Sequence, residues 1–412
     1  SGVKYVPKKM IVKWKEKDPV VLFEKYLFRN KIINDVQIKE IDSKIDKNIT
    51  PILDECIVKK ISKTSKAKEL EDVFYKDKFK SLKSKDSKLN NIRYVDAIKD
   101  SLYLKMKQDK TVLIMGQDIA EYGGVFKVTE GFVNEFGKER VRNTPIIESA
   151  AIGTAMGLSL GGFKPVVEMQ FADFVSNGFN QIVNNLAKTH YRWGQPINVT
   201  LRLPTGAGIG GGPFHSQSNE SWFFHVPGLK IVYPSNPYDA KGLFSTALNS
   251  ENPILFLEHR EIIMKKEKIP DEQYQIPFGQ AKILIEGSQL TVVSLANMLL
   301  IAEEVIHELS DSGKYSIELI DPRCVSPIDY ETIIESVKKT GRLLIIDEAF
   351  EPCSIASQIS SKICDIAFDY LDAPIKLLNG SFSPTPYSPC LENEIIPSKE
   401  IIKQKIVEVI NE

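Results

Sequence analysis

The stretch from Asn143 to Gly162, which reads NTPIIESAAIGTAMGLSLGG, contains a single charged residue, Glu148. The small and apolar residues after Glu148 predict a buried helix, in which Gly153 and Gly157 would let another backbone come close. A carboxylate at the N-terminus of such a helix is poorly solvated by water and is suited to proton exchange with a bound heterocycle. A structural alternative stays open, because the helix dipole also favours a carboxylate at a helix N-terminus.

Outside this stretch, apolar runs alternate with helical patterns. Residues 92–266 predict an α/β domain with a mostly parallel sheet covered on both faces. Its elements are a helix over 94–108 and strands over 111–115, 165–171, 197–203, 230–233 and 254–258. A polar, strand-poor crossover over 267–288 is expected to lead to a second, smaller α/β domain over 289–412.

The first 90 residues differ in charge from the rest of the chain. They carry 23 Lys and Arg against 14 Asp and Glu, whereas the whole chain has a net charge of −1. The lysines are interleaved with acids and lack the pattern of a nucleic-acid surface, so no nucleic-acid partner is expected. Residues 56–91 predict an extended or partly disordered linker, and a solvated helix over 67–80 is equally consistent with the composition.

An arm over residues 1–55 is expected to contain two amphipathic helices. The first begins at Asp18 and closes at Asn30, and the second ends before Pro51. Because two short helices bury little surface alone, the arm is expected to lie on another body.

The most unusual segment, residues 204–220, reads PTGAGIGGGPFHSQSNE. Its glycines run into Pro213 and open no helix, and no Walker lysine is present, so it matches neither a dinucleotide loop nor a P-loop. It predicts a mobile active-site loop that orders over a ligand and delivers His215. A flexible surface turn is the alternative. Asp173 is expected to orient a loop.

The sequence also argues against several kinds of binding site and of partner. The five cysteines are scattered without a Cys-x-x-Cys pair, so neither a disulfide framework nor a zinc site is expected, and a bacterial-type cytoplasm or an organelle matrix fits best. No apolar run reaches the length of a membrane span, so no membrane partner is expected. The chain also lacks a Gly-Asp-Gly with a downstream Asn, the arrangement that binds a magnesium diphosphate.

Five segments together are similar to the beta subunit of the decarboxylating component of 2-oxo acid dehydrogenase complexes. They are GQDIAEYGGVF (116–126), NTPIIE (143–148), EMQFAD (168–173), HSQS (215–218) and PGLKIV (227–232). The resemblance covers residues 92–412 and implies a transketolase-like α/β fold, with a pyrimidine-binding domain followed by the transketolase C-terminal domain. Residues 1–55 resemble the carboxy-terminal end of the family's alpha subunit, so the chain resembles the late part of a fused alpha–beta protein.

The resemblance implies thiamine diphosphate as the cofactor and assigns roles to four residues. Glu148 matches a catalytic glutamate bonded to N1′ of the aminopyrimidine ring, and Gln170 matches a residue of the cofactor pocket. Phe174 stands where many relatives have Tyr, which keeps ring stacking and removes a hydroxyl. His215 matches a catalytic histidine that donates a proton or orients groups while a lipoyl group is reductively acylated.

The resemblance also implies metal ions. The magnesium and diphosphate half of the cofactor site would come from the alpha region, which accounts for the missing motif. A structural potassium ion is implied near Ile197, Val199, Thr200, Ala247, Ser250 and Asn252. Ser250 stands where relatives have Asp, so one formal charge is missing from that site.

The implied function is the beta-type part of a thiamine diphosphate-dependent 2-oxo acid dehydrogenase. Its implied partners are an alpha subunit or alpha region, a second beta-type chain in a heterotetramer-like assembly, and a lipoyl acyltransferase core. Residues 215–218 favour a branched-chain 2-oxo acid as the substrate, as in 2-oxoisovalerate dehydrogenase, with pyruvate as the second choice. An acetoin-cleaving component and a non-catalytic docking module stay open, and this chain alone is expected to be inactive.

Overall fold

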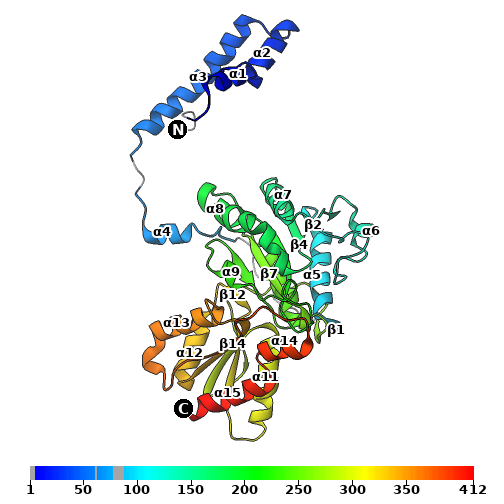
Figure 1. Ribbon diagram of the computed structural model, residues 1–412, viewed down its shortest axis with the longest axis vertical. Coiled ribbons are helices and arrows are strands. Elements are labelled where there is room, and N and C mark those ends of the chain that lie inside the picture. The colour runs from blue at the N-terminus through cyan, green and yellow to red at the C-terminus, as the bar shows by residue number, and fades with distance from the viewer. Residues whose placement is uncertain (1–4, 61–62, 78–87) are drawn as a thin grey trace. The chain divides into compact units, whose positions relative to one another are not determined.

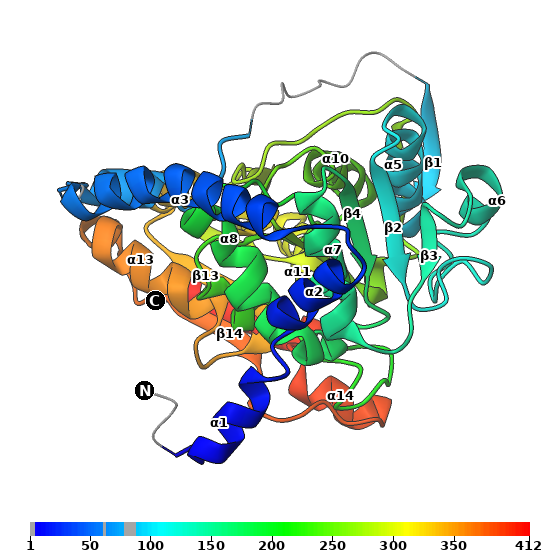
Figure 2. The same cartoon turned by 90° about the horizontal axis from the view of Figure 1, so that it is seen from above.

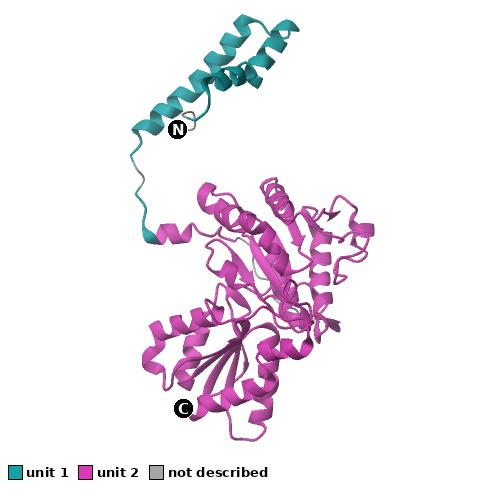
Figure 3. Ribbon diagram, in the orientation of Figure 1, with its two compact units in different colours: residues 1–66 teal, residues 67–412 magenta. Residues whose placement is uncertain are grey.

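The computed structural model describes residues 5–60, 63–77 and 88–412 (Figure 1). The chain forms two compact units, residues 1–66 and 67–412 (Figure 3). Of the linker predicted over 56–91, residues 61–62 and 78–87 lie outside the described part. Within the described ranges, no helix is long and apolar enough to cross a membrane.

The described residues of the smaller unit form the helices α1 (Lys8–Lys15), α2 (Pro19–Arg29) and α3 (Asp35–Val58). Asp18 caps α2, because its Oδ1 accepts a hydrogen bond from the backbone N–H of Val20 at 2.9 Å. The prediction that the second helix ends before Pro51 is wrong, since α3 continues through Pro51. Proline removes one backbone hydrogen bond, but this part of α3 is exposed, so water can bind the freed carbonyl.

The first domain of the larger unit is built on a seven-stranded sheet with the order β12-β6-β7-β5-β4-β2-β3. Six strands are parallel: β2 (Val112–Gly116), β3 (Val141–Asn143), β4 (Lys164–Glu168), β5 (Thr200–Thr205), β6 (Lys230–Val232) and β7 (Ile254–His259). The seventh, β12 (Cys324–Ser326), pairs antiparallel with β6. The second half of the chain thus completes the edge of the first sheet, which the sequence pattern does not predict.

Alternate residues of the central strands face two hydrophobic layers. Leu113 and Val167 belong to the layer of α7 (Glu148–Leu160), and Ile114 and Val166 belong to the layer of α5 (Tyr94–Gln108) and α10 (Pro237–Ala247). In Figure 2, α7 and α5 flank β2 and β4. The predicted helix over 94–108 and the covering of both sheet faces are therefore confirmed. The shorter helices are α4 (Lys66–Glu71), α6 (Phe132–Phe136), α8 (Ala187–Trp193) and α9 (Ser221–Phe224).

Strands also occur in the segment expected to be a strand-poor crossover, so that expectation is wrong. β8 (Lys266–Pro270) pairs antiparallel with β1 (Leu89–Arg93). β9 (Lys282–Ile285) pairs antiparallel with β11 (Ile317–Asp321). Because these partners are distant in sequence, and because β8 is also rich in charged residues, the local pattern carries little signal of them.

The second domain has a five-stranded sheet with the order β14-β13-β10-β11-β9. Its parallel strands are β10 (Leu290–Ser294), β11, β13 (Leu343–Phe350) and β14 (Lys376–Gly380). Its helices are α11 (Ala296–Ser310), α12 (Tyr330–Thr340), α13 (Ile355–Ala367), α14 (Pro389–Ile395) and α15 (Lys399–Asn411). This is the second α/β series that the sequence predicts.

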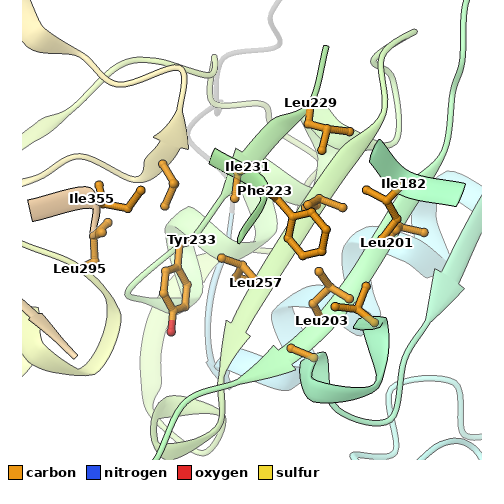
Figure 4. Close-up of a cluster of buried hydrophobic side chains, with 14 of the residues drawn as sticks. Ile182, Leu201, Leu203, Phe223, Leu229, Ile231, Tyr233, Leu257, Leu295 and Ile355 are labelled. Carbon is orange, nitrogen blue, oxygen red and sulfur yellow. The ribbon is translucent and has the colours of Figure 1, made fainter. Parts of the chain in front are cut away.

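One hydrophobic cluster extends through both domains (Figure 4). The first domain contributes side chains such as Leu203, Phe223 and Tyr233, and the second contributes Leu295 and Ile355. Burying each such side chain contributes about 1.5–3 kcal/mol. Because a close-packed interior transmits displacements, this shared cluster holds the loops of the two domains in a fixed relation.

Candidate active site

Glu148 lies at the carboxyl edge of the first sheet. It is the first residue of α7 and is 7% exposed. Gln117, directly after β2, donates a hydrogen bond from Nε2 to Oε1 of Glu148 at 3.3 Å. The carboxyl ends of parallel strands are where ligands bind in such sheets. The structure therefore places this acid next to the expected ligand position.

Within the described chain, no other backbone comes close to Gly153 or Gly157 of α7, so the expectation that another backbone packs there stays a prediction. A Cβ added at Gly157 would meet no described atom within 4 Å, and one added at Gly153 would meet only the side chain of Gln181, at 3.7 Å. Thr154 and Leu160 on the same helix are exposed. α7 thus buries one face against the sheet and leaves the other open.

Phe171, Phe174 and His215 form an aromatic cluster. The ring centroid of His215 lies 5.0 Å from that of Phe171 and 5.4 Å from that of Phe174, with the rings nearly perpendicular. Gln170 immediately precedes Phe171 in the segment after β4, and all four side chains are half-buried. The structure thus brings His215 and Phe174 together and adds Phe171, to which the sequence assigned no role.

The turn that carries Phe174 also reaches the start of α7. It is a 3-10 helix over Ala172–Gly178. A Cβ added at Gly178 would collide with Ile152 on α7 and would lie 3.7 Å from the backbone carbonyl carbon of Glu148. Glycine at this position leaves room for the side chain of Ile152, and the approach sets Phe174 and Glu148 on adjoining segments.

Asp173 ties the loop of His215 to this turn. Its Oδ1 accepts hydrogen bonds from the backbone N–H of Gln217 at 3.1 Å and from Nε2 of Gln217 at 2.9 Å. Asn219 donates from Nδ2 to the carbonyl oxygen of Ala172 at 2.9 Å. This arrangement confirms that Asp173 orients a loop.

The glycine-rich part of that loop is bound by two acids of the second domain. Gly208 and Gly210 have φ of +96° and +66°, and their N–H groups donate to Oε1 and Oε2 of Glu392, each at 2.9 Å. Ala207 donates its N–H to Oε1 of Glu348 at 2.7 Å. Glycines at these left-handed positions let successive N–H groups converge on one carboxylate. The predicted mobility of the loop stays a prediction.

Glu348 is also paired with His259. The distance from His259 Nε2 to Glu348 Oε2 is 2.8 Å, and both side chains are buried. Burial opposes ionisation of Glu348, but His259, the N–H of Ala207 and the hydroxyl of Ser218 outweigh it and lower its pKa to about 2. Glu348 therefore stays charged and holds the loop over the whole physiological pH range.

Two further buried acids lie near this pair. Burial, and then the charge of Asp347, raise the pKa of Glu220 well above its usual value. Burial also raises the pKa of Asp347 to about 6, and Glu348 adds to the effect. Neither carboxyl oxygen of Glu220 has a hydrogen-bond partner among the described residues. Burial thus favours the neutral form of Glu220, a group that sequence reasoning did not single out.

A buried ion cluster lies beneath the site. Arg202, which is fully buried, donates from Nε and Nη2 to the two carboxylate oxygens of Glu258 at 2.7 Å each, and Nη1 pairs with Glu168. Burial raises the pKa of Glu168, while Arg202 opposes that rise. Bidentate pairing of this kind is geometrically specific. It fixes the ends of β4, β5 and β7, from which the site loops leave.

The six residues implied in a potassium site lie close together. They come from the approach to β5 and from the end of α10 and the turn after it, and all are buried: Ile197, Val199, Thr200, Ala247, Ser250 and Asn252. The N–H of Ile197 donates to the carbonyl of Glu251 at 3.1 Å, which joins the two segments. In the described ranges, no group of three or more His, Cys, Asp or Glu is placed to hold a metal ion.

Comparison with family models gives two matches. The transketolase pyrimidine binding domain matches residues 90–265, and the transketolase C-terminal domain matches residues 279–402. Among solved structures, a split gene transketolase described as an inactive beta4 tetramer is similar with a TM-score of 0.65 at 20% identity, covering 78% of this chain and 99% of that chain. This likeness shows a transketolase-like fold.

Three curated relatives are each 39% identical to the chain. They are acetoin:2,6-dichlorophenolindophenol oxidoreductase subunit beta and 2-oxoisovalerate dehydrogenase subunit beta of Bacillus subtilis, and pyruvate dehydrogenase E1 component subunit beta of Staphylococcus epidermidis. The first two alignments cover 77% of this chain and the third covers 75%, with 96%, 98% and 96% of the respective relatives. Equal identities do not separate the three named activities.

Proposed function

We propose that this chain, which belongs to the family of transketolase-like beta subunits of 2-oxo acid dehydrogenase E1 components, is the beta-type part of a thiamine diphosphate-dependent 2-oxo acid dehydrogenase. The observation that carries the proposal is the position of Glu148. It is a buried acid at the carboxyl edge of a parallel sheet, beside the turn that carries Phe174. Such an edge is the usual place for a cofactor.

The residues of the site fit the pyrimidine half of thiamine diphosphate. Glu148 would share a proton with N1′ of the aminopyrimidine ring through a hydrogen bond, since its buried carboxyl group lies at the sheet edge where the ring would bind. Phe174 and Gln170 would line the ring pocket. The bound cofactor supplies the carbon nucleophile that attacks the 2-oxo acid. His215 would orient groups or move a proton next to the bound cofactor, because its ring packs against Phe171 and Phe174.

A partner is part of this proposal. The exposed face of α7, which includes Thr154 and Leu160, is apolar or small next to the catalytic acid, as expected for a surface covered by another chain. The diphosphate and its magnesium would come from an alpha subunit or alpha region, to whose carboxy-terminal end residues 1–55 are similar. A second beta-type chain and a lipoyl acyltransferase core would complete the assembly, in a bacterial-type cytoplasm or an organelle matrix.

The substrate is proposed to be a branched-chain 2-oxo acid, on the basis of the segment at residues 215–218. Pyruvate is the second choice, and the relatives include a subunit of each named type. Decarboxylation of 3-methyl-2-oxobutanoate and of pyruvate by the complete enzyme, measured side by side as kcat/KM, decides between them. Cleavage of acetoin in the same assay would point instead to the third activity named among the relatives.

The test of the chemistry is Glu148→Gln in the complete enzyme. Glutamine keeps the shape but cannot hold the proton, so we expect decarboxylation to fall by about 100-fold or more. Assembly, followed by light scattering after size exclusion, should stay unchanged. Glu272→Gln, at an exposed position of the same unit, is the matched control and should retain activity. Full activity of the Glu148→Gln enzyme would contradict the proposal and favour a docking module.

A further inference from the structure

The described residues just before the masked segment form a short anchor, Phe74–Asp77, bound to the first domain. The backbone of Tyr75 exchanges two hydrogen bonds with the side chain of Asn252, one from Tyr75 N to Oδ1 and one from Nδ2 to Tyr75 O, each at 2.9 Å. The ring of Tyr75 also packs edge-on against His190, with centroids 5.3 Å apart. Part of the predicted linker is thus a fixed piece of the domain.

Asp77 is the centre of this anchor. Its carboxylate accepts hydrogen bonds from the hydroxyl of Ser250 at 3.0 and 3.1 Å and from the backbone N–H of Glu251 at 2.7 Å. Nδ2 of Asn252 donates to it at 3.2 Å. An ion pair joins Asp77 to Lys230, with Nζ and Oδ2 separated by 2.7 Å. The two side chains are only 16% and 15% exposed, so solvent screens the pair weakly.

The residues implied in a potassium site do not fit a monovalent cation. A hard cation needs oxygen ligands that are free to face it, and a nearby carboxylate strengthens its binding. Here Oδ1 of Asn252 is taken by Tyr75, and the carbonyl oxygen of Ser250 accepts a hydrogen bond from Nδ2 of Asn198. Residue 250 carries no charge, and the carboxylate that does reach this corner, that of Asp77, is already neutralised by Lys230.

We propose that the Asp77–Lys230 ion pair replaces a structural monovalent cation in this chain. The ammonium group supplies the positive charge, and the anchor supplies, from more than 170 residues upstream in the sequence, the carboxylate that Ser250 lacks. The same contacts join the turn after α10 to Lys230 at the start of β6. The chain therefore needs residues 74–77, and not an added ion, to stabilise the turn after α10.

The first test compares thermal unfolding of the full chain in potassium, sodium and choline chlorides at equal ionic strength. We expect the same Tm in all three salts, because the described residues around Ser250 and Asn252 leave no open cation site. A Tm that is higher in potassium than in sodium and choline by several degrees would overturn the proposal. This comparison needs no variant, so it holds even where a substitution prevents folding.

The second test compares Asp77→Asn with Asp72→Asn. Asp72 lies in the same stretch but makes an exposed pair with Lys68, with side chains 46% and 58% exposed. Because Asp77→Asn leaves the ammonium of Lys230 largely buried without its partner, we expect Tm to fall by at least about 3 °C. Asp72→Asn should shift Tm by less than about 1 °C. Equal shifts for the two variants would also overturn the proposal.

Discussion

At the scale of single residues, Asp347 shows how burial makes an acid sensitive to pH. Burial raises its pKa to about 6 in the folded protein, from an ordinary value of 3.8. Between these two values the folded state keeps a proton that the unfolded chain releases. The free energy of unfolding therefore falls as pH rises through this window, by on the order of 3 kcal/mol in total, and stays lower above it.

We predict that Asp347→Asn stabilises the protein more at pH 8 than at pH 5. Asparagine stays neutral and can still accept the hydrogen bond that Oδ1 takes from the N–H of Ala349. The measurement is Tm of variant and parent at both pH values, with Asp369→Asn, at an exposed position, as control. A difference in Tm that does not change between pH 5 and pH 8 would refute the shifted pKa.

At the scale of elements, the loop of residues 204–220 depends on α14. We predict that Glu392→Gln loosens this loop, because an amide accepts through only one oxygen and directs its N–H₂ group at the second glycine N–H. Hydrogen exchange at Gly208 and Gly210 should rise, and activity of the complete enzyme should fall by about 10-fold. Glu394→Gln, at an exposed position of the same helix, is the control. Equal protection in both variants would contradict the prediction.

The same loop shows how far sequence reasoning reaches. The helix over 94–108 and the central parallel strands were predictable, because their apolar periodicity is local. Glu148 and His215 could be singled out by their residue type within unusual stretches. Glu392 and Asp77 could not, because each lies in an unremarkable polar segment and binds residues at least 153 positions away. Contacts of that range leave no periodic signal along the chain.

At the scale of the whole molecule, the proposed function gives the described chain one half of a cofactor site. Under that proposal the chain holds the pyrimidine ring, and no group of three or more His, Cys, Asp or Glu suited to a metal occurs in the described ranges. We predict that this chain alone binds thiamine diphosphate weakly and has no turnover, because the diphosphate contributes much of the affinity through its magnesium. Calorimetric titration of the cofactor measures this directly. Sub-micromolar affinity would show that the site is complete without a partner.

The edge strand β12 has a consequence for synthesis of the protein. The first sheet ends at β6 until residues 324–326 arrive and pair with it. Domains usually fold as they emerge from the ribosome. During translation of the residues between β6 and β12, however, the edge of β6 stays without its partner strand. An unpaired strand edge invites association with other nascent chains. Translation products that end before residue 324 should therefore be prone to aggregate and should be bound by chaperones.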